Sequence, residues 1–367
     1  MPNTTPDELR AILDDPAAMS RIDASNMMGS VTDFATQCRE AVRIGAGFHP
    51  PAMSNRPIDN IVVTGLGGSA IGGDLLRCLV DADGDAPLIV NRDYGLPGFV
   101  GRESLVVAAS YSGNTEETIA AYEQARVRRA QIVCVTSGGE LATRAQADEV
   151  PVCLIPGGQQ PRAGTGYMFF PMLYILMQRG LFYRALTSDI DETLLTLERL
   201  RVEYGPETPL ERNPAKQLAV ALHRRIPIFY GAHSYGGVVA YRWKCQFNEN
   251  GKQHAFANVF PEMNHNEILA WTNSSTQAGN WSIVYLRDPV ERTESARIAR
   301  RVEITRDIIG EAATSHEVWA VGRSLLCRMF SLMFLGDCTS VYAAYLAGSD
   351  PTAIPGIEQL KSELAKG

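Results

Sequence analysis

The stretch from Trp243 to Asn266 concentrates side chains that could transfer protons. It holds two polar clusters on either side of a short apolar segment, which we expect to be a strand or a turn. The first cluster is Asn248, Glu249, Asn250, Lys252 and His254, and the second is Glu262, Asn264, His265, Asn266 and Glu267. Either cluster alone would also suit a helix end or a solvated loop. We interpret Glu249 and His265 as an acid/base pair, because the chain also carries two loops suited to binding phosphate.

These two loops each follow an apolar run and precede a helical pattern. The first, Gly65 to Asp74, follows residues 60–64, and the second, Ser110 to Thr118, follows residues 104–109. A helix that begins in such a loop offers free backbone N–H groups and the positive end of its dipole to an anion. The hydroxyl donors are Ser69 in the first loop and Ser110, Ser112 and Thr115 in the second. Two neighbouring loops of this kind suit a terminal phosphate monoester.

Other interpretations of the loops are open. Gly65, Gly67 and Ala70 satisfy the G-x-G-x-x-G/A pattern of dinucleotide-binding folds. That pattern also requires an acidic residue about 20 residues further on, for which this chain offers only a poor candidate. Thr115 could serve only as the N-cap of the helix that follows it. Gly72 and Gly73 could be only turn residues. The hydroxyl-rich second loop favours a phosphate monoester over a pyrophosphate.

Strands that alternate with helices must position both loops. We expect strands at 60–64, 87–90, 104–109, 131–136 and 150–155, and a second set at 226–231, 281–286 and 317–321. This alternation predicts an α/β fold with two doubly wound parallel sheets in three-layer αβα domains. The expected parts are an N-terminal helical extension (1–45), a first domain (46–205), a second domain (206–350) and a C-terminal helix (351–367). Thr5 to Glu8 is a typical helix start.

Composition limits the partners and cofactors. The 367 residues carry a net charge of −7 without a long basic run, which argues against nucleic acid as a partner. The apolar run Tyr167–Met177 is too short to span a bilayer, and no targeting segment is visible. The seven cysteines contain no Cys-x-x-Cys pair, and the spacing of the histidines at 49, 223, 233, 254 and 316 is not that of a metal site. We expect a cytoplasmic protein without metal or cofactor.

The loops GLGGSAIGGDLL and SYSGNTEET resemble those of the sugar isomerase (SIS) domain. Further segments resemble one family, the bifunctional phosphoglucose/phosphomannose isomerases. They are QPRAGTGY (160–167), ERNPAK (211–216), WKCQFNENGKQHAF (243–256), FPEMNHNEI (260–268), DCTSVYAAYLAGSDP (337–351) and IEQLKSEL (357–364). The resemblance runs from residue 60 to 364 and leaves the 1–45 extension unexplained. It implies two SIS domains and a homodimer with active sites at the subunit interface.

The resemblance also implies a role for individual residues. The phosphate of the substrate would be bound by Gly68, Ser69, Ser110, Ser112 and Thr115. Arg162 would lie over the C1–C2 region of the sugar, Glu249 would be the base, His265 the ring-opening acid and Lys361 its partner. Thr352, which precedes Lys361, is our candidate for a small polar residue that leaves room beside C2.

This set of residues is sufficient for aldose–ketose interconversion. One carboxylate can move the proton between C1 and C2 through a cis-enediol, and a guanidinium can stabilise the charge on the two oxygens. Histidine titrates in the range that ring opening needs. We therefore expect an isomerase that converts glucose 6-phosphate, and mannose 6-phosphate as well, to fructose 6-phosphate. The alternative, a non-catalytic sugar-phosphate-binding SIS regulator, would leave Arg162, Glu249, His265 and Lys361 without a role.

Overall fold

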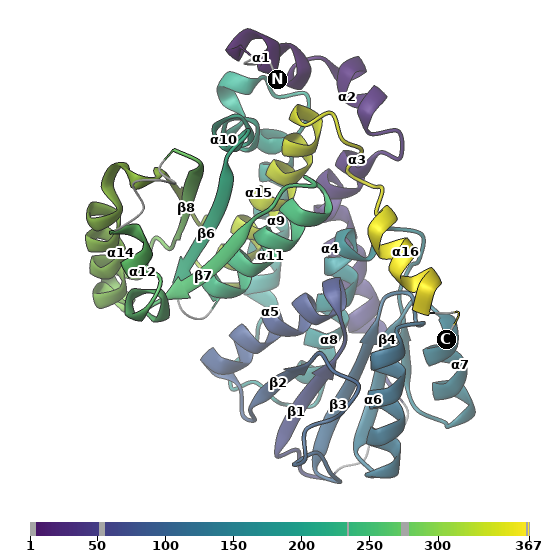
Figure 1. Ribbon diagram of the computed structural model, residues 1–367. Coiled ribbons are helices and arrows are strands. Elements are labelled where there is room, and N and C mark those ends of the chain that lie inside the picture. Colours follow the sequence, from purple (N-terminus) through teal and green to yellow (C-terminus); the bar gives the residue numbers. More distant parts are fainter. Residues whose placement is uncertain (1–4, 51–55, 233–234, 273–278, 365, 367) are drawn as a thin grey trace. The chain divides into compact units, whose positions relative to one another are not determined.

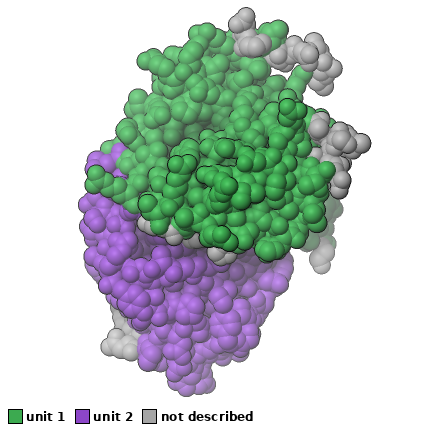
Figure 2. Space-filling model, turned by 90° about the vertical axis from the view of Figure 1, so that its left-hand side faces the viewer, with its two compact units in different colours: residues 1–32, 196–323, 328–367 green, residues 33–195, 324–327 purple. Residues whose placement is uncertain are grey.

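The chain divides into two compact units, each built around one parallel sheet. The computed structural model describes residues 5–50, 56–232, 235–272, 279–364 and 366. Unit 1 comprises residues 1–32, 196–323 and 328–367, and unit 2 comprises residues 33–195 and 324–327 (Figure 2). Helices flank the sheet in each unit (Figure 1), which confirms the predicted α/β fold with two parallel sheets.

The sheet of unit 2 has five parallel strands in the order β2–β1–β3–β4–β5. They are β1 (Asn60–Thr64), β2 (Leu88–Asn91), β3 (Ser104–Ser110), β4 (Gln131–Thr136) and β5 (Val152–Leu154). All five strands were predicted, because β3 and β4 are buried along their whole length and read as apolar runs. The chain passes from β1 outward to β2 and then back to β3 on the other side of β1. The loops after β1 and β3 therefore meet where the strand order reverses.

Helices of unit 2 cover this sheet, and one of them begins within the predicted first glycine loop. They are α4 (Phe34–Gly47), α5 (Gly67–Asp83), α6 (Glu116–Val127), α7 (Gly139–Ala147), the 3₁₀ helix η1 (Pro161–Ala163) and α8 (Thr165–Gln178). Because α5 begins at Gly67, the interpretation of Gly72 and Gly73 as turn residues is wrong. A Cβ on Gly73 would lie 2.9 Å from Val63 Cγ1, and one on Gly72 would lie 3.2 Å from Met172 Cε. Both glycines allow α5 to pack closely against its neighbours.

The sheet of unit 1 has four parallel strands in the order β7–β6–β8–β9. They are β6 (Ile226–Ala232), β7 (Phe256–Phe260), β8 (Trp281–Arg287) and β9 (Thr314–Trp319). The apolar segment between the two polar clusters is thus a strand, β7. The strand predicted at 317–321 begins earlier, because Thr314 to Trp319 pair in register with Ser282 to Arg287. Its first residues, Thr314 and Ser315, are exposed and polar, and hydrophobicity alone could not reveal them.

The helices of unit 1 include the first and the last described helix of the chain. They are α1 (Pro6–Leu13), α2 (Pro16–Ile22), α3 (Met27–Thr32), η2 (Leu210–Arg212), α10 (Pro214–Leu222), α11 (Tyr235–Glu249), η3 (Glu262–His265), α12 (Ile268–Trp271), α13 (Glu291–Glu294), α14 (Ala296–Ile309), η4 (Gly310–Ala312) and α16 (Pro355–Leu364). Two further helices, α9 (Thr187–Tyr204) and α15 (Leu325–Leu346), have residues in both units. The predicted start of α1 is confirmed, since Thr5 and Glu8 form a capping box.

The helix α15 is long and apolar enough to cross a membrane by length and composition. Its most apolar window of 18 residues is completely buried inside the protein. A core helix of a globular fold has the same properties, and the burial indicates that α15 serves as one.

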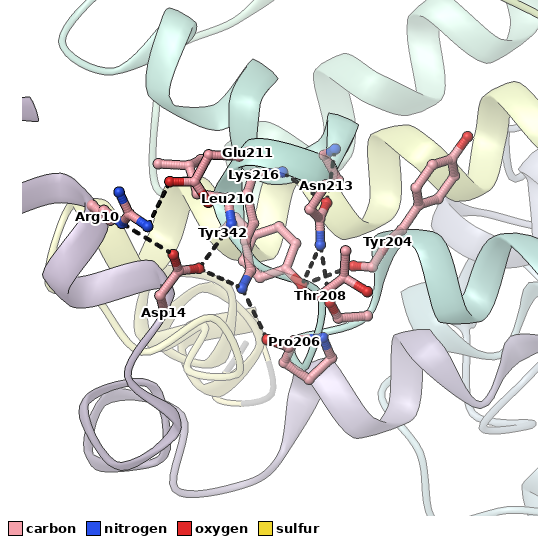
Figure 3. A network of polar contacts seen from close by, with 12 residues as sticks. Arg10, Asp14, Tyr204, Pro206, Thr208, Leu210, Glu211, Asn213, Lys216 and Tyr342 are labelled. Atoms are coloured by element: carbon pink, nitrogen blue, oxygen red, sulfur yellow. Dashed lines mark hydrogen bonds and ion pairs between the residues drawn. The ribbon is translucent and has the colours of Figure 1, made fainter.

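A buried ion pair ties the first helices of the chain to the rest of unit 1 (Figure 3). The side chain of Lys216 on α10 has no solvent exposure, and its Nζ donates to Asp14 Oδ1 at 3.1 Å and to the Pro206 carbonyl at 2.9 Å. Burial lowers the pKa of the Lys216 amine, an effect that Asp14 opposes. Asp14 also accepts from Leu210 N at 2.9 Å. Because a buried charge without partners is costly, these contacts hold the segment that carries α1 and α2 in place.

Candidate active site

The two hydroxyl-rich loops lie side by side at the carboxyl edge of the sheet in unit 2. They follow the neighbouring strands β1 and β3, so they meet where the strand order reverses. Ser69 Oγ accepts a hydrogen bond of 3.2 Å from Tyr111 N, which joins the first loop to the second. Ser110 Oγ lies 2.9 Å from Thr115 Oγ1 and accepts from Gly113 N at 3.1 Å. The structure thus brings together hydroxyls that the sequence placed 46 residues apart, from Ser69 to Thr115.

The contacts of the second loop show whether the Thr115 side chain caps the helix that follows it. Thr115 occupies the N-cap position of α6, but its side chain makes no capping hydrogen bond and pairs with Ser110 instead. Ser112 is exposed on the same loop, and its Oγ accepts from Asn114 N at 3.3 Å. Gly113 has a φ of +71°, and a Cβ there would lie 1.8 Å from the Gly138 carbonyl oxygen. Only glycine permits this loop to turn beside residue 138.

Arg162 lies next to the first loop, on η1. A Cβ on Gly68 would come within 2.5 Å of the Pro161 carbonyl oxygen and 3.4 Å of Arg162 Cα, so the lack of a side chain allows this approach. Arg162 is only 4% exposed, and its Nη1 donates to Gln160 Oε1 at 3.4 Å. Unit 2 therefore assembles the predicted phosphate residues and the predicted guanidinium in one region.

Two residues that the sequence did not single out hold the arginine segment. Gln37 on α4 donates to the Ala163 carbonyl at 2.8 Å and to Gln159 Oε1 at 2.9 Å, and it accepts from Gly166 N at 2.8 Å. Tyr111 in the second loop accepts from Gln159 N at 3.2 Å. Tyr111 belongs to the SYSGNTEET segment and could have been noticed there. Gln37 offers no local signal, because its role depends on contacts with residues more than 120 positions away.

Glu249 is the last residue of α11, and α11 is fixed against α15. Arg242 donates from Nη2 and Nε to the two oxygens of Asp337 at 2.7 and 3.0 Å, and Gln246 donates to the same carboxylate at 3.0 Å. The Trp243 indole lies where a Cβ on Gly336 would stand, 2.2 Å from its ring atoms. These contacts leave α11 little freedom to rotate, so the direction in which Glu249 leaves the helix is set.

Lys252 joins the turn after Glu249 to the segment that carries Thr352. Its Nζ donates to the Glu249 carbonyl at 2.5 Å and to the Pro351 carbonyl at 3.2 Å. Thr352 is partly buried, and its N–H donates to Asp350 Oδ1 at 2.8 Å. The structure therefore places the proposed C2 neighbour beside the turn that follows the proposed base. Lys252 belongs to the first polar cluster, and its sequence context indicated no role for it. In the structure, its side chain links the Glu249 and Pro351 carbonyls.

His265 and Lys361 occupy exposed positions elsewhere in unit 1. His265 ends η3, which follows the carboxyl end of β7 in the chain, whereas Glu249 comes before the amino end of β7. At about 3.3 Å per residue, the strand alone separates its two ends by roughly 13 Å. Lys361 lies on α16, and within the described ranges no hydrogen bond or ion pair joins it to His265. Within the described residues the structure thus shows no contact between His265 and Lys361, and β7 separates His265 from Glu249 along the chain.

Histidine, cysteine and acidic side chains do not assemble into a metal site in the described part of the chain. No group of three His, Cys, Asp or Glu side chains there could hold a metal ion. Burial lowers the pKa of His223 and of His316, which is typical of partly buried structural histidines. His233 lies outside the described residues.

Comparisons with known proteins identify the family. Residues 211–364 match the sequence model of the bacterial phospho-glucose isomerase C-terminal SIS domain. The bifunctional phosphoglucose/phosphomannose isomerase of Caldicellulosiruptor bescii is 43% identical over 341 residues, which cover 93% of this chain and 99% of that protein. The protein of the same name from Thermoplasma volcanium is 34% identical, over 84% of this chain and 92% of its own length.

Solved structures agree on the fold. A hypothetical protein from Thermus thermophilus superimposes with a TM-score of 0.73 over 98% of this chain and 94% of that protein, at 16% identity. Identity this low supports the fold alone, whereas the sequence relatives match nearly the whole chain at much higher identity. The resemblance found in the sequence is confirmed, and this chain belongs to the bifunctional phosphoglucose/phosphomannose isomerase family.

Proposed function

We propose that this protein is an aldose–ketose isomerase that interconverts glucose 6-phosphate and mannose 6-phosphate with fructose 6-phosphate. The observation that carries the proposal is in unit 2, where two hydroxyl-lined loops meet at the reversal of strand order and Arg162 lies against the first of them. A phosphate bound by the loops would place a sugar chain within reach of a buried guanidinium. The Glu249 carboxylate on a fixed helix supports the same chemistry.

The phosphate would be held by donors and not by a metal. The hydroxyls of Ser69, Ser110, Ser112 and Thr115 and the backbone N–H of Gly68 can donate to its oxygens. Anchoring at C6 leaves C1 and C2 at the other end of an open-chain sugar. We infer that Arg162 lies over that end and stabilises the negative charge on the C1 and C2 oxygens.

The proton transfers follow from the remaining residues. From the aldose, Glu249 would take the proton from C2 to give the cis-enediolate. A proton then moves from the C2 hydroxyl to the C1 oxygen through the cis-enediol, and Glu249 returns its proton to C1 to give the ketose. His265, assisted by Lys361, would protonate the ring oxygen while the anomeric hydroxyl loses its proton, which opens the ring. We propose that Thr352 leaves room for rotation about C2–C3, so that Glu249 can return a proton to either face of C2.

We infer that the protein works as a homodimer with interface active sites. Glu249 precedes β7 and His265 follows it, and the strand alone separates its two ends by roughly 13 Å. Supply of His265 by a second copy would complete the set. We further place the protein in the cytoplasm, with no nucleic acid or membrane as partner. Its seven cysteines are all free, which suits a reducing compartment.

A coupled assay with each sugar 6-phosphate, run in excess EDTA, tests the proposed activity. We expect conversion of glucose 6-phosphate and of mannose 6-phosphate to fructose 6-phosphate at rates that exhaustive chelation leaves unchanged. Loss of activity in EDTA that zinc or manganese restores would show a metal-dependent mechanism instead. Tight binding of sugar phosphates without any turnover would favour the non-catalytic regulator.

The phosphate assignment predicts a selective loss of binding in the double variant Ser110→Ala/Thr115→Ala. Each lost hydrogen bond to a charged group costs about 1.5–3 kcal/mol, so KM for fructose 6-phosphate should rise at least tenfold. Steady-state kinetics measure this, and Thr143→Ala provides a control, since it removes an exposed hydroxyl elsewhere in unit 2. An unchanged KM in the double variant would exclude these hydroxyls from the phosphate site.

A further inference from the structure

The residues on both sides of His265 are anchored to other elements of unit 1, although the imidazole itself is exposed. Met263 is completely buried, whereas Glu262, His265 and Asn266 face solvent. Across the described parts of the chain, no residue makes a hydrogen bond with the imidazole. The imidazole is thus held only through its backbone, and the contacts of its neighbours decide where it points.

The first anchor joins η3 to α14 through Asn264. Asn264 Nδ2 donates to Thr305 Oγ1 at 2.7 Å, and Asn264 Oδ1 accepts from Arg301 Nη1 at 3.5 Å. Thr305 is 1% exposed, so its hydroxyl has little access to water as a replacement partner. The residue directly before His265 is therefore fixed to a helix about 40 positions further along the chain.

The second anchor joins Glu267 to two strands. Its carboxylate accepts from the Tyr230 hydroxyl on β6 and from Asn258 Nδ2 on β7, the latter at 2.6 Å. Trp271 Nε1 donates to the same Tyr230 hydroxyl at 3.0 Å. Burial, followed by the Glu267 charge, raises the pKa of Tyr230 and keeps it protonated as a donor. The Glu267 carboxylate therefore holds the segment after His265 against the sheet. The Glu262 carboxylate accepts from Asn266 Nδ2 at 3.0 Å within the same segment.

We propose that Asn264 and Thr305 are positioning residues for His265. Their hydrogen bond sets the direction of the imidazole and thereby the rate of ring opening. The inference rests on the proposed role of His265 as the ring-opening acid. Proton transfer requires the two heavy atoms to approach within about 2.6–3.2 Å, and displacements near 1 Å can cost about 100-fold in rate. A loop held at both ends provides that accuracy for a side chain that makes no hydrogen bond with any described residue.

Thr305→Val tests the proposal because it keeps the shape of the side chain and removes the hydroxyl, while Thr305→Ser keeps the hydroxyl. With glucose 6-phosphate, which is mostly ring-closed, kcat of Thr305→Val should fall roughly 10- to 100-fold, and KM should change little. With an aldose phosphate too short to close a ring, catalysed exchange of the C2 proton into D₂O should remain near the wild-type rate. Thr305→Ser should restore ring-substrate turnover, and Asn264→Ala should reproduce the defect.

The variant His265→Ala separates this inference from the proposed function. If His265→Ala is slow only with the ring-closed substrate, the ring-opening role is supported, and adding Thr305→Val to it should cause no further loss. Three results would overturn the positioning role alone. They are equal slowing of both substrates by Thr305→Val, normal turnover of the ring-closed substrate by Thr305→Val, and an additive loss in the double variant. Wild-type turnover of the ring-closed substrate by His265→Ala would overturn the proposed role of His265 and this inference with it.

Discussion

Glu249→Gln should lose most of kcat, about 10²–10⁴-fold, while the KM for fructose 6-phosphate stays within a few-fold of the wild type. Glutamine has the size of glutamate but cannot accept a proton from C1 or C2. The contacts that fix α11, from Arg242 and Gln246 to Asp337, do not involve the Glu249 carboxylate. The fold and the phosphate site should therefore survive the substitution. Steady-state kinetics in both directions measure the split between kcat and KM.

Glu311→Gln is the matched control for this prediction. Glu311 is an exposed carboxylate on η4 of unit 1, outside both polar clusters. Its removal should leave kcat nearly unchanged. If Glu249→Gln keeps a tenth or more of wild-type kcat, or changes KM only, another group must move the C1/C2 proton.

Arg162→Gln should have the second largest effect, a fall in kcat of about 10²–10³-fold, as expected for the loss of a group that stabilises charge in the transition state. The developing charge lies on two oxygens, which a planar guanidinium can contact together. Arg162→Lys should recover only part of the loss, because an ammonium has a different shape and reach. The substitution also removes the contact with Gln160, so thermal unfolding must be compared with that of the wild type.

Arg126→Gln serves as the control for Arg162. Arg126 is a partly exposed arginine of unit 2 that pairs with Asp148 and Glu123, and its loss should not slow turnover. Full activity of Arg162→Lys, or an effect of Arg162→Gln on KM alone, would mean that Arg162 binds the sugar without stabilising the enediol.

The strands could be predicted from the sequence where their whole surface is buried. Residues 61–63, 105–109 and 132–135 are continuous apolar runs, and the structure forms β1, β3 and β4 there. The start of α5 was missed because its glycines resemble turn residues, while their role is close packing against β1 and α8. The beginning of β9 was missed because its polar residues are recognised only through their pairing with β8. Local patterns thus predict an element well when all of its residues are buried. They predict its bounds less well when these depend on packing or pairing with another element.

The same limit applies to the candidate site. The strand–loop–helix pattern predicted the two loops, and the structure brings Ser69, Ser110 and Thr115 together. No pattern pointed to Gln37 or to the bond between Asn264 and Thr305, because each depends on residues distant in the chain. The roles of His265 and Lys361 came from the family resemblance and remain predictions.

Solvent isotope uptake tests the central claim most directly, because it follows the one proton that the mechanism moves. Fructose 6-phosphate incubated with the protein in D₂O should yield both glucose 6-phosphate and mannose 6-phosphate, and each should carry deuterium at C2. The account predicts this because the proton on Glu249 can exchange with solvent before it returns to either face of C2. Labelled glucose 6-phosphate without any mannose 6-phosphate would contradict the dual activity, and products without C2 deuterium would contradict an enediol that exchanges its proton with solvent.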